Sequence, residues 1–336
     1  MFLTRNTLWR TLTGNRCEYL TITTKGEPEQ IKSRKGIFLS ARVHPGETGA
    51  SYMIEGIINF LTSNTIEAQI LRDKFVFKII PMLNPDGVIH GNYRCSLAGC
   101  DLNRRWRNPS SVLHPPVFKA KELCLQFAAQ RDLLLYCDLH GHSRRKNLFI
   151  YGNTSSEIEE DVKLFPFIMS KICEPFWYRY CKFRVQRHKE STARVAMWKN
   201  LPIFNVFTLE ASFWGASIGT LRDMHFRSKD YHYMGHKLCQ AILVYAKIEC
   251  PSLTNYLKNE EEEVENKQDD EKNNYDDLSV ASASNQSHSL PRGFYKINNL
   301  QKGWISALNP TKHQNNFIYV SSSLQIKSKI SCFIGK

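Results

Sequence analysis

His44-Pro45-Gly46-Glu47 lies between a predicted strand and a predicted helix. An imidazole and a carboxylate three residues apart can bind the same metal ion. The Pro-Gly pair between them favours the tight turn that such chelation needs. A His-x-x-Glu pattern alone is weak evidence, because it arises often by chance. The interpretation therefore depends on whether a third ligand, a base and a substrate anchor occur elsewhere in the chain.

Apolar segments and amphipathic segments alternate on both sides of this stretch. Strands are predicted over residues 17–24, 36–41, 75–80, 133–137 and 203–209, and helices over 50–61, 117–130, 160–174, 192–200 and 229–248. Near-continuous apolar strands that alternate with helices predict an α/β fold. We expect a mixed, mostly parallel central sheet with helices on both faces.

Polar residues follow the predicted strands at four places. They are His44 with Glu47, the Asn84–Gly87 turn, Asp138 with His140, and Glu210. In sheets of this kind the ligand site lies outside the carboxyl ends of the strands. The convergence of four such strand ends predicts a functional site at that edge of the sheet.

The composition fits one large domain with an extension. The chain has 336 residues, of which 42% are hydrophobic, enough for a domain of about 250 residues. Its ten cysteines include no C-x-x-C pair, and its polar, arginine-bearing first residues do not read as a secretory signal. No apolar run reaches the roughly 18 residues of a membrane span. We therefore expect free thiols, a cytosolic location and no membrane partner.

The charge is unevenly distributed along the chain. The net charge is +13, but residues 259–277 hold ten acids and two lysines, so the rest of the chain carries +21. A basic globular part suits a polyanionic partner, whether nucleic acid, a membrane surface or an acidic polypeptide. Charge alone does not choose among these. The acidic run and the Ser/Asn/Gln-rich stretch that follows it are typical of disordered segments.

A catalytic zinc ion typically has three protein ligands and an open fourth position for water. His44, Glu47 and His140 would form such a set and hold one zinc ion per chain. His142 competes for the third place, but His140 lies closer to the predicted strand. Zinc would lower the pKa of a bound water towards about 7. Glu210, next to a buried strand, is then a candidate base for that water's proton.

The residues around these positions resemble the cytosolic carboxypeptidases, a branch of the carboxypeptidase A-like zinc peptidases. The resemblance covers about residues 12–248. The sequence is most similar to the type 2 and type 3 members. The matching text is ARVHPGE at 41–47, FVFKIIPMLNPDGVIHGNYRCSLAGCDLNRRW at 75–106, LLYCDLHGHSRRKNLFIYG at 134–152, FTLEASFWG at 207–215 and GTLRD at 219–223.

The resemblance implies roles for individual side chains. It assigns zinc binding to the two histidines and Glu47 named above, and the role of general base to Glu210. Asn103 and Arg104 match the pair that holds the terminal carboxylate of the substrate, for which a planar guanidinium is well suited. Arg94 matches the arginine that polarises the scissile carbonyl. Asp101 matches the acid that orients the first zinc histidine.

The resemblance also implies a substrate. Residues 182–199 resemble the segment that shapes the pocket for the terminal side chain, and Arg194 lies near the position that reads it. A cation there favours an acidic terminal residue, with Lys189 and Arg187 as further candidates. The family implies removal of glutamate from polyglutamylated proteins, above all tubulin. No nucleic-acid partner is expected, and the expected location is the cytosol, including microtubules and cilia.

The expected domain organisation has three parts. Residues 1–16 are predicted to be the remnant of a lead-in from a missing N-terminal β-rich domain, which family members normally carry. Residues 17–250 are the predicted catalytic domain, and 251–336 a disordered tail.

Two other functions remain open from the sequence. One is a zinc amidohydrolase acting on acylamino acids, which shares the His-x-x-Glu pattern and the distant histidine. The other is a truncated, inactive homologue that binds microtubules or other polyanions without turnover. The intact set of candidate catalytic residues argues against the inactive homologue.

Overall fold

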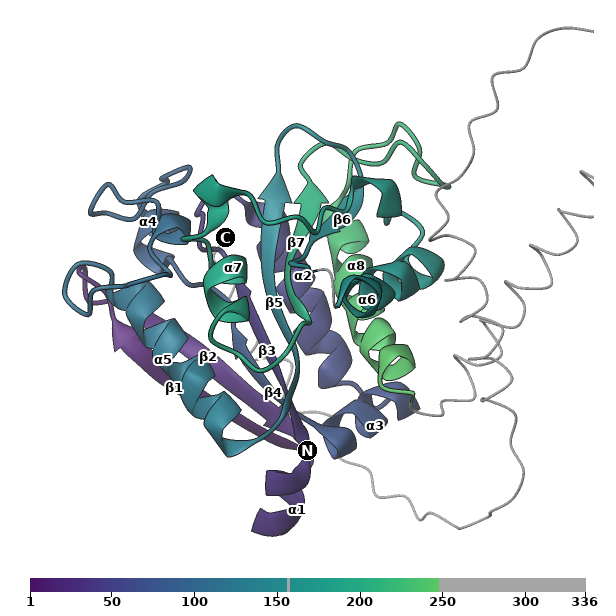
Figure 1. Ribbon diagram of the computed structural model, residues 1–336, viewed down its shortest axis with the longest axis horizontal. Helices are drawn as coiled ribbons and strands as arrows, with labels where there is room; N and C mark the ends of the chain where they lie inside the picture. The colour runs from purple at the N-terminus through teal and green to yellow at the C-terminus, as the bar shows by residue number, and fades with distance from the viewer. Residues whose placement is uncertain (156–157, 248–336) are drawn as a thin grey trace, which may run out of the picture. The chain divides into compact units, whose positions relative to one another are not determined.

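The computed structural model describes residues 1–155 and 158–247, and these contain a seven-stranded sheet (Figure 1). In spatial order its strands are β1 (Phe2–Arg10), β2 (Arg16–Thr23), β4 (Phe75–Ile80), β3 (Lys35–Ala41), β5 (Leu133–His142), β7 (Val206–Ser212) and β6 (Leu148–Tyr151). The four central strands β4, β3, β5 and β7 are parallel, and the pairings towards both edges are antiparallel. The predicted mixed α/β sheet is confirmed.

Helices cover both faces of the sheet. They are α1 (Pro28–Ser33), α2 (Thr48–Leu61), α3 (Ile66–Lys74), α4 (Pro85–Ile89), α5 (Pro115–Gln130), α6 (Glu159–Ile172), α7 (Ala193–Trp198) and α8 (Ser228–Tyr245), with short 3-10 turns η1 (Leu102–Arg104), η2 (Tyr178–Tyr180) and η3 (Arg187–Lys189). Figure 1 shows α5 and α7 in front of the sheet and α2 behind it. Behind the sheet, α2 packs on α8, which also contacts α3 and α6. None of the described helices is long and apolar enough to cross a membrane.

Strand alternation connects the apolar core to the polar site. Phe38 of β3 and Tyr136 of β5 stack with their ring centroids 5.5 Å apart, in the core beneath α5 and α7. Successive side chains of a strand point to opposite faces. Ser40, Asp138 and His140 therefore continue along the same face towards the carboxyl ends of the strands. On this face of β3 and β5, the side chains therefore change from apolar core residues to polar site residues within one or two positions along the face.

Two strands extend further than the sequence pattern predicts. The apolar runs predict strand ends at 137 and 209, but β5 continues to His142 and β7 to Ser212. The cause is their parallel pairing, which places His140 directly beside Glu210. Both candidate site residues thus lie within strands rather than in the loops that follow.

The first residues of the chain join the same sheet. Residues 1–16 are predicted to be a lead-in remnant, and in the structure β1 is the edge strand paired to β2. The hairpin turn is fastened to α4, because Asp86 accepts hydrogen bonds from Thr13 and Asn15. The predicted tail 251–336 lies outside the described residues, and the proposed division into domains stays a prediction.

Candidate active site

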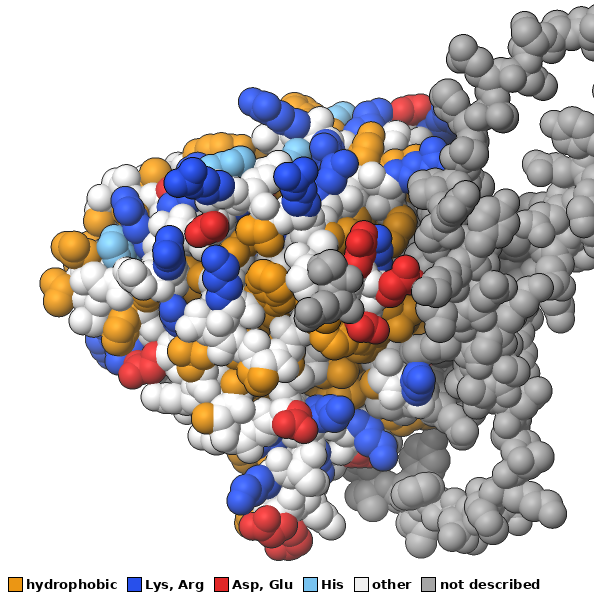
Figure 2. Space-filling model, in the orientation of Figure 1, with side chains coloured by type: hydrophobic (Ala, Val, Ile, Leu, Met, Phe, Trp, Pro, Cys, Tyr) orange, Lys and Arg blue, Asp and Glu red, His pale blue; other side chains and the backbone are white. Residues whose placement is uncertain are grey.

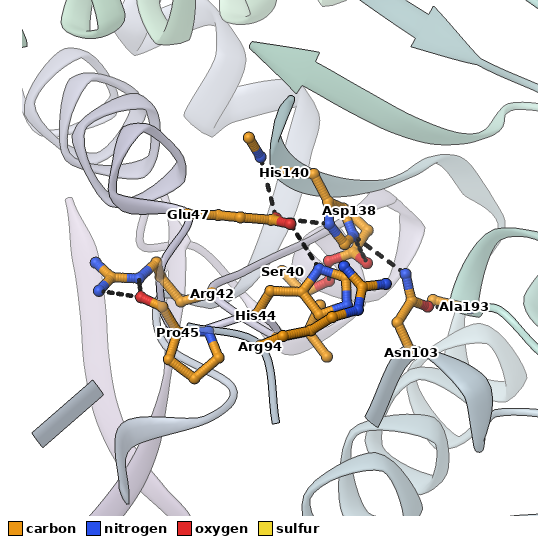
Figure 3. A network of polar contacts seen from close by, with 12 residues as sticks. Ser40, Arg42, His44, Pro45, Glu47, Arg94, Asn103, Asp138, His140 and Ala193 are labelled. Carbon is orange, nitrogen blue, oxygen red and sulfur yellow. Dashed lines mark hydrogen bonds and ion pairs between the residues drawn. The ribbon is translucent and has the colours of Figure 1, made fainter. Parts of the chain in front are cut away.

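The His-x-x-Glu turn joins β3 to α2 and forms one wall of a buried cluster. His44 Nδ1 lies 2.7 Å from Glu47 Oε1, and His140 Nδ1 from β5 lies 2.9 Å from Glu47 Oε2 (Figure 3). One ligand atom from each of the three residues lies within 4.8 Å of the others. Two imidazoles and one carboxylate are a donor set that suits zinc. The residues present therefore fit the implied metal ion.

Gly46 is required at this turn because the chain passes very close to it. Its N–H donates to the carbonyl of Tyr93 at 2.8 Å. A Cβ at this position would lie 2.6 Å from the Tyr93 ring. The Pro-Gly pair thus lets the turn fit beneath the segment that carries Arg94.

Each imidazole is also held at its outer nitrogen by an acid. His44 Nε2 lies 3.1 Å from Asp101 Oδ1, and His140 Nε2 lies 2.7 Å from Asp138 Oδ2. Ser40 in turn donates to the other oxygen of Asp138 at 2.7 Å. Such partners fix the ring orientation and leave the Nδ1 atoms facing Glu47. The resemblance implies this role for Asp101, whereas the sequence gives no such role to Asp138 or Ser40.

The charges of the cluster perturb its pKa values strongly. Burial alone would raise the pKa of Glu47, but the charges and hydrogen bonds of His140 and His44 hold it well below its ordinary value. Burial disfavours the charged form of His140, but Asp138 and Glu47 on either side raise its pKa well above the ordinary value. The carboxylates at this site are therefore arranged to hold positive charge at its centre.

His142, the alternative third ligand, has a different task. Its Nδ1 accepts the backbone N–H groups of Arg144 and Arg145 at 3.2 and 3.0 Å, and its ring packs edge-on against Phe149. The Nδ1 atom of His142 therefore shapes the turn after β5, and the metal-ligand cluster contains His44, Glu47 and His140. Of the two histidines, the structure brings His140 to the cluster.

Glu210 lies in β7 beside His140 in the paired register and is partly exposed. Desolvation by the surrounding protein raises its pKa to about 7, with a further contribution from the charge of Glu47, against the opposing effect of His140 and His44. A carboxylate whose pKa lies near neutrality can both accept and return a proton at physiological pH.

The anchors expected for a terminal carboxylate lie on η1. The side-chain amide of buried Asn103 bridges two parts of the site: Oδ1 accepts from Ala193 N at 2.8 Å, and Nδ2 lies 3.5 Å from His140 Nε2. The next residue, Arg104, donates to the carbonyl of Asn103. Arg94 Nε donates to Asp101 at 2.8 Å. Asp101 therefore joins Arg94 to His44 and lowers the mobility of both.

The three candidates for reading the terminal side chain lie on the neighbouring elements α7 and η3. Arg194 of α7 is buried, and its Nη1 donates to the carbonyl of Gly152 and to Asn153 Oδ1. Burial lowers the pKa of Arg194 to about 10, and the charges of Tyr151 and Glu210 oppose this shift. Burial lowers the pKa of Lys189 in η3 as well. Arg187, the further candidate, is exposed on the same turn.

These cations act on one another across the site. Burial is the largest cause of the lowered pKa of Lys189. The charges of Arg104, Arg94 and Arg194 lower this pKa further, whereas the charge of Glu210 raises it. Arg94, Arg104 and Arg194 thus lie within electrostatic range of Lys189, and Lys189 and Arg194 within range of Glu210, so the combined field of the four cations favours an anion. Tyr151, which the sequence analysis did not single out, lies two residues from Phe149 along β6 and interacts with Glu210 and Arg194.

Comparison with known proteins agrees with this geometry. The family model described as zinc carboxypeptidase matches residues 3–200. The fold is similar to a metallo-carboxypeptidase from Burkholderia cenocepacia, with a TM-score of 0.64 and 23% identity over 73% of this chain and 65% of that one. It is also similar to a metallo-carboxypeptidase from Pseudomonas aeruginosa, with a TM-score of 0.61 and 24% identity over 71% and 64% of the two chains. The chain belongs to the zinc carboxypeptidase family.

Within this family the sequence relationship is to the cytosolic carboxypeptidases of types 2 and 3. The chain is 43% identical to cytosolic carboxypeptidase 3 of Bos taurus over 256 residues, 75% of this chain and 25% of that protein. It is 43% identical to cytosolic carboxypeptidase 2 of Homo sapiens over 246 residues, 72% of this chain and 27% of that protein. The chain therefore spans about a quarter of the length of these relatives.

Proposed function

We propose that the chain is a zinc metallocarboxypeptidase that removes C-terminal glutamates from polyglutamylated proteins, such as tubulin. The observation that carries this proposal is a set of four cations, Arg94, Arg104, Lys189 and Arg194. The charges of the three arginines act on Lys189, and Lys189 and Arg194 lie within electrostatic range of Glu210, which is paired with the metal-ligand candidate His140. A terminal glutamate carries two carboxylates. One set of cations can hold the main-chain carboxylate, and another can hold the carboxylate of the side chain.

The residues divide the work of hydrolysis. Asn103 and Arg104 bind the terminal carboxylate, and Arg194 with Lys189 binds the side-chain carboxylate. His44, Glu47 and His140 would hold a zinc ion, which would acidify a bound water and polarise the scissile carbonyl. Glu210 accepts the proton of the attacking water and transfers it to the leaving amine. Arg94, fixed by Asp101, stabilises the negative charge that develops on the carbonyl oxygen.

The proposal extends to partners and location. Acidic protein tails are the proposed partners, because the anchor Arg104 and the specificity residues Arg194 and Lys189 are cationic. The names of the related cytosolic carboxypeptidases support a cytosolic location, and a tubulin substrate would take the protein to microtubules or cilia.

Mass spectrometry of tail peptides tests the proposal. The full chain, loaded with zinc, is incubated with a tubulin-tail peptide that bears a polyglutamate branch. We expect stepwise loss of glutamate from the free C-terminus and no reaction with the same peptide carrying a C-terminal amide. Release of an acyl group from acylamino acids in place of glutamate would favour the amidohydrolase. Binding of the peptide by zinc-loaded, folded protein without any release would contradict the proposal.

A further inference from the structure

The side chain of Arg42 holds the proposed metal-binding turn through its backbone. Its Nε and Nη2 both donate to the carbonyl of Pro45, at 3.0 and 2.7 Å, and its Nη1 donates to Ser51 Oγ at 2.6 Å. Pro45 lies between the two ligand residues of the turn, and Ser51 lies in the first turns of α2. Figure 3 shows the guanidinium beside Pro45, apart from the imidazoles. One rigid side chain thus links the turn to the helix that follows Glu47.

The backbone at Arg42 is shaped for this contact. Its φ is +57°, a left-handed conformation that is unfavourable for an L-residue and is normally adopted by glycine. The carbonyls of Ala41 and Arg42 accept the N–H groups of Leu83 and Asn84, at 2.9 and 3.1 Å. The segment after β4 therefore holds this unfavourable conformation, and with it the course of the side chain under the turn.

The partners of Arg42 indicate a geometric role. The guanidinium is buried, and its hydrogen bonds within the described residues go to a carbonyl and a hydroxyl rather than to a carboxylate. Burial lowers the pKa of Arg42, and the charge of Glu47 opposes this shift. A buried charge whose hydrogen bonds reach no carboxylate is costly to maintain. Its planar fork meets the turn and the helix at once, which the single ammonium group of lysine cannot reproduce.

We infer that Arg42 is a positioning residue that sets the separation of His44 and Glu47 for a divalent metal ion. This inference rests on the metal cluster of the proposed function and makes no use of the substrate. It predicts that Arg42→Lys, which keeps the charge, still weakens zinc binding.

The test compares two buried arginines in the full chain. Arg72 of α3 is buried and donates to the carbonyls of Leu61 and Ser63, far along the chain from the cluster. Arg72→Lys therefore controls for the general effect of losing a buried guanidinium. Zinc affinity is measured by competition with a chromophoric chelator, and circular dichroism records the fold of each metal-free variant. We expect Arg42→Lys to weaken zinc binding about 10- to 100-fold, and Arg72→Lys to leave the affinity at the wild-type value.

Wild-type zinc affinity in Arg42→Lys, or an equal loss in both variants, would overturn the inference. If Arg42→Lys does not fold, zinc affinity is measured for Ser51→Ala, which removes only the acceptor of the Arg42 Nη1 hydrogen bond. A weakening of about threefold or more supports the inference, and an unchanged affinity overturns it. Failure of the proposed function is distinguishable, because zinc binding without glutamate release leaves the role of Arg42 intact.

Discussion

The carboxyl group of Glu210 combines two properties that a general base needs. It lies beside His140 in the sheet, and desolvation raises its pKa to about 7. A base with a pKa near the working pH can accept a proton from water and return it within one turnover. Glu210 is not one of the three proposed metal ligands, so the base can be replaced while His44, Glu47 and His140 are kept.

Glu210→Gln tests this role by removing the proton acceptor while keeping the shape of the side chain. We expect kcat for glutamate release to fall by about 10²- to 10⁴-fold, the usual range for a general acid-base group, with zinc affinity unchanged. Steady-state kinetics and chelator competition check the two halves of this expectation. A variant that keeps wild-type kcat would exclude Glu210 as the base.

Arg194 is expected to select the terminal side chain. Arg194→Gln should lower kcat/KM for a peptide ending in glutamate by about 10- to 100-fold, because a hydrogen bond to a charged group contributes about 1.5–3 kcal/mol. For a peptide ending in glutamine, kcat/KM should fall much less. The ratio of the kcat/KM values for the two peptides does not depend on the fraction of folded protein. Arg187→Gln, on the exposed turn nearby, should leave the ratio unchanged, and an equal loss for both peptides in Arg194→Gln would rule out the selective role.

At the scale of elements, the N-terminal hairpin is fastened to the site edge of the sheet through Asp86. Thr13 Oγ1 and Asn15 Nδ2 donate to Asp86 Oδ1 at 2.6 and 2.9 Å. Burial would raise the pKa of Asp86, but these hydrogen bonds lower it below the ordinary value. The contact connects the edge hairpin to α4, which directly follows the Asn84 turn.

Asp86→Ala should lower the free energy of unfolding by about 1–3 kcal/mol at pH 7, because it removes the hydrogen bonds that Thr13 and Asn15 donate to a charged carboxylate. Because the folded pKa of Asp86 is depressed, its stabilisation is fully present above the unfolded pKa of about 3.9 and is lost as pH falls below it. Urea unfolding at pH 7 and pH 3 should therefore show a smaller difference between variant and wild type at pH 3. Glu122→Ala, which removes an exposed ion pair on α5, is the control. A difference that grows in acid would contradict the account.

Most elements follow from the sequence, and those missed have physical reasons. The edge strand β1 mixes exposed and half-buried residues, and β6 has only four residues, so neither gives a clear pattern. The end of β5 is rich in polar residues, so the apolar run predicts a strand that ends at residue 137. Its pairing with β7, a contact distant in sequence, keeps it in the sheet.

The sequence predicts only part of the candidate site, because some of its contacts also join residues that are distant in sequence. His44 and Glu47 are neighbours in sequence, so their joint action follows from local spacing alone. The hydrogen bond between Ser40 and Asp138 joins residues 98 positions apart, and no local pattern predicts it. The only signal was that Asp138 lies two residues before His140 and shares its face of the strand.

For the molecule as a whole, the described residues bring the metal ligands, the base and the cations to the same edge of the sheet. They come from the loop after β3, from β5 and β7, and from the segments around η1, η3 and α7. This is the edge at which parallel sheets bind their ligands. The surface shown in Figure 2 also displays several Lys and Arg side chains, in keeping with an acidic partner for a chain of net charge +13.

A zinc titration of activity tests the central claim most directly. Metal-free wild type, His140→Ala and His142→Ala are titrated with zinc while glutamate release from a polyglutamylated peptide is recorded. We predict that activity in the wild type and in His142→Ala rises until one zinc ion is bound per chain, and that His140→Ala neither binds zinc at this stoichiometry nor releases glutamate. Retention of stoichiometric zinc and activity by His140→Ala would contradict the assignment of His44, Glu47 and His140 as the catalytic metal centre.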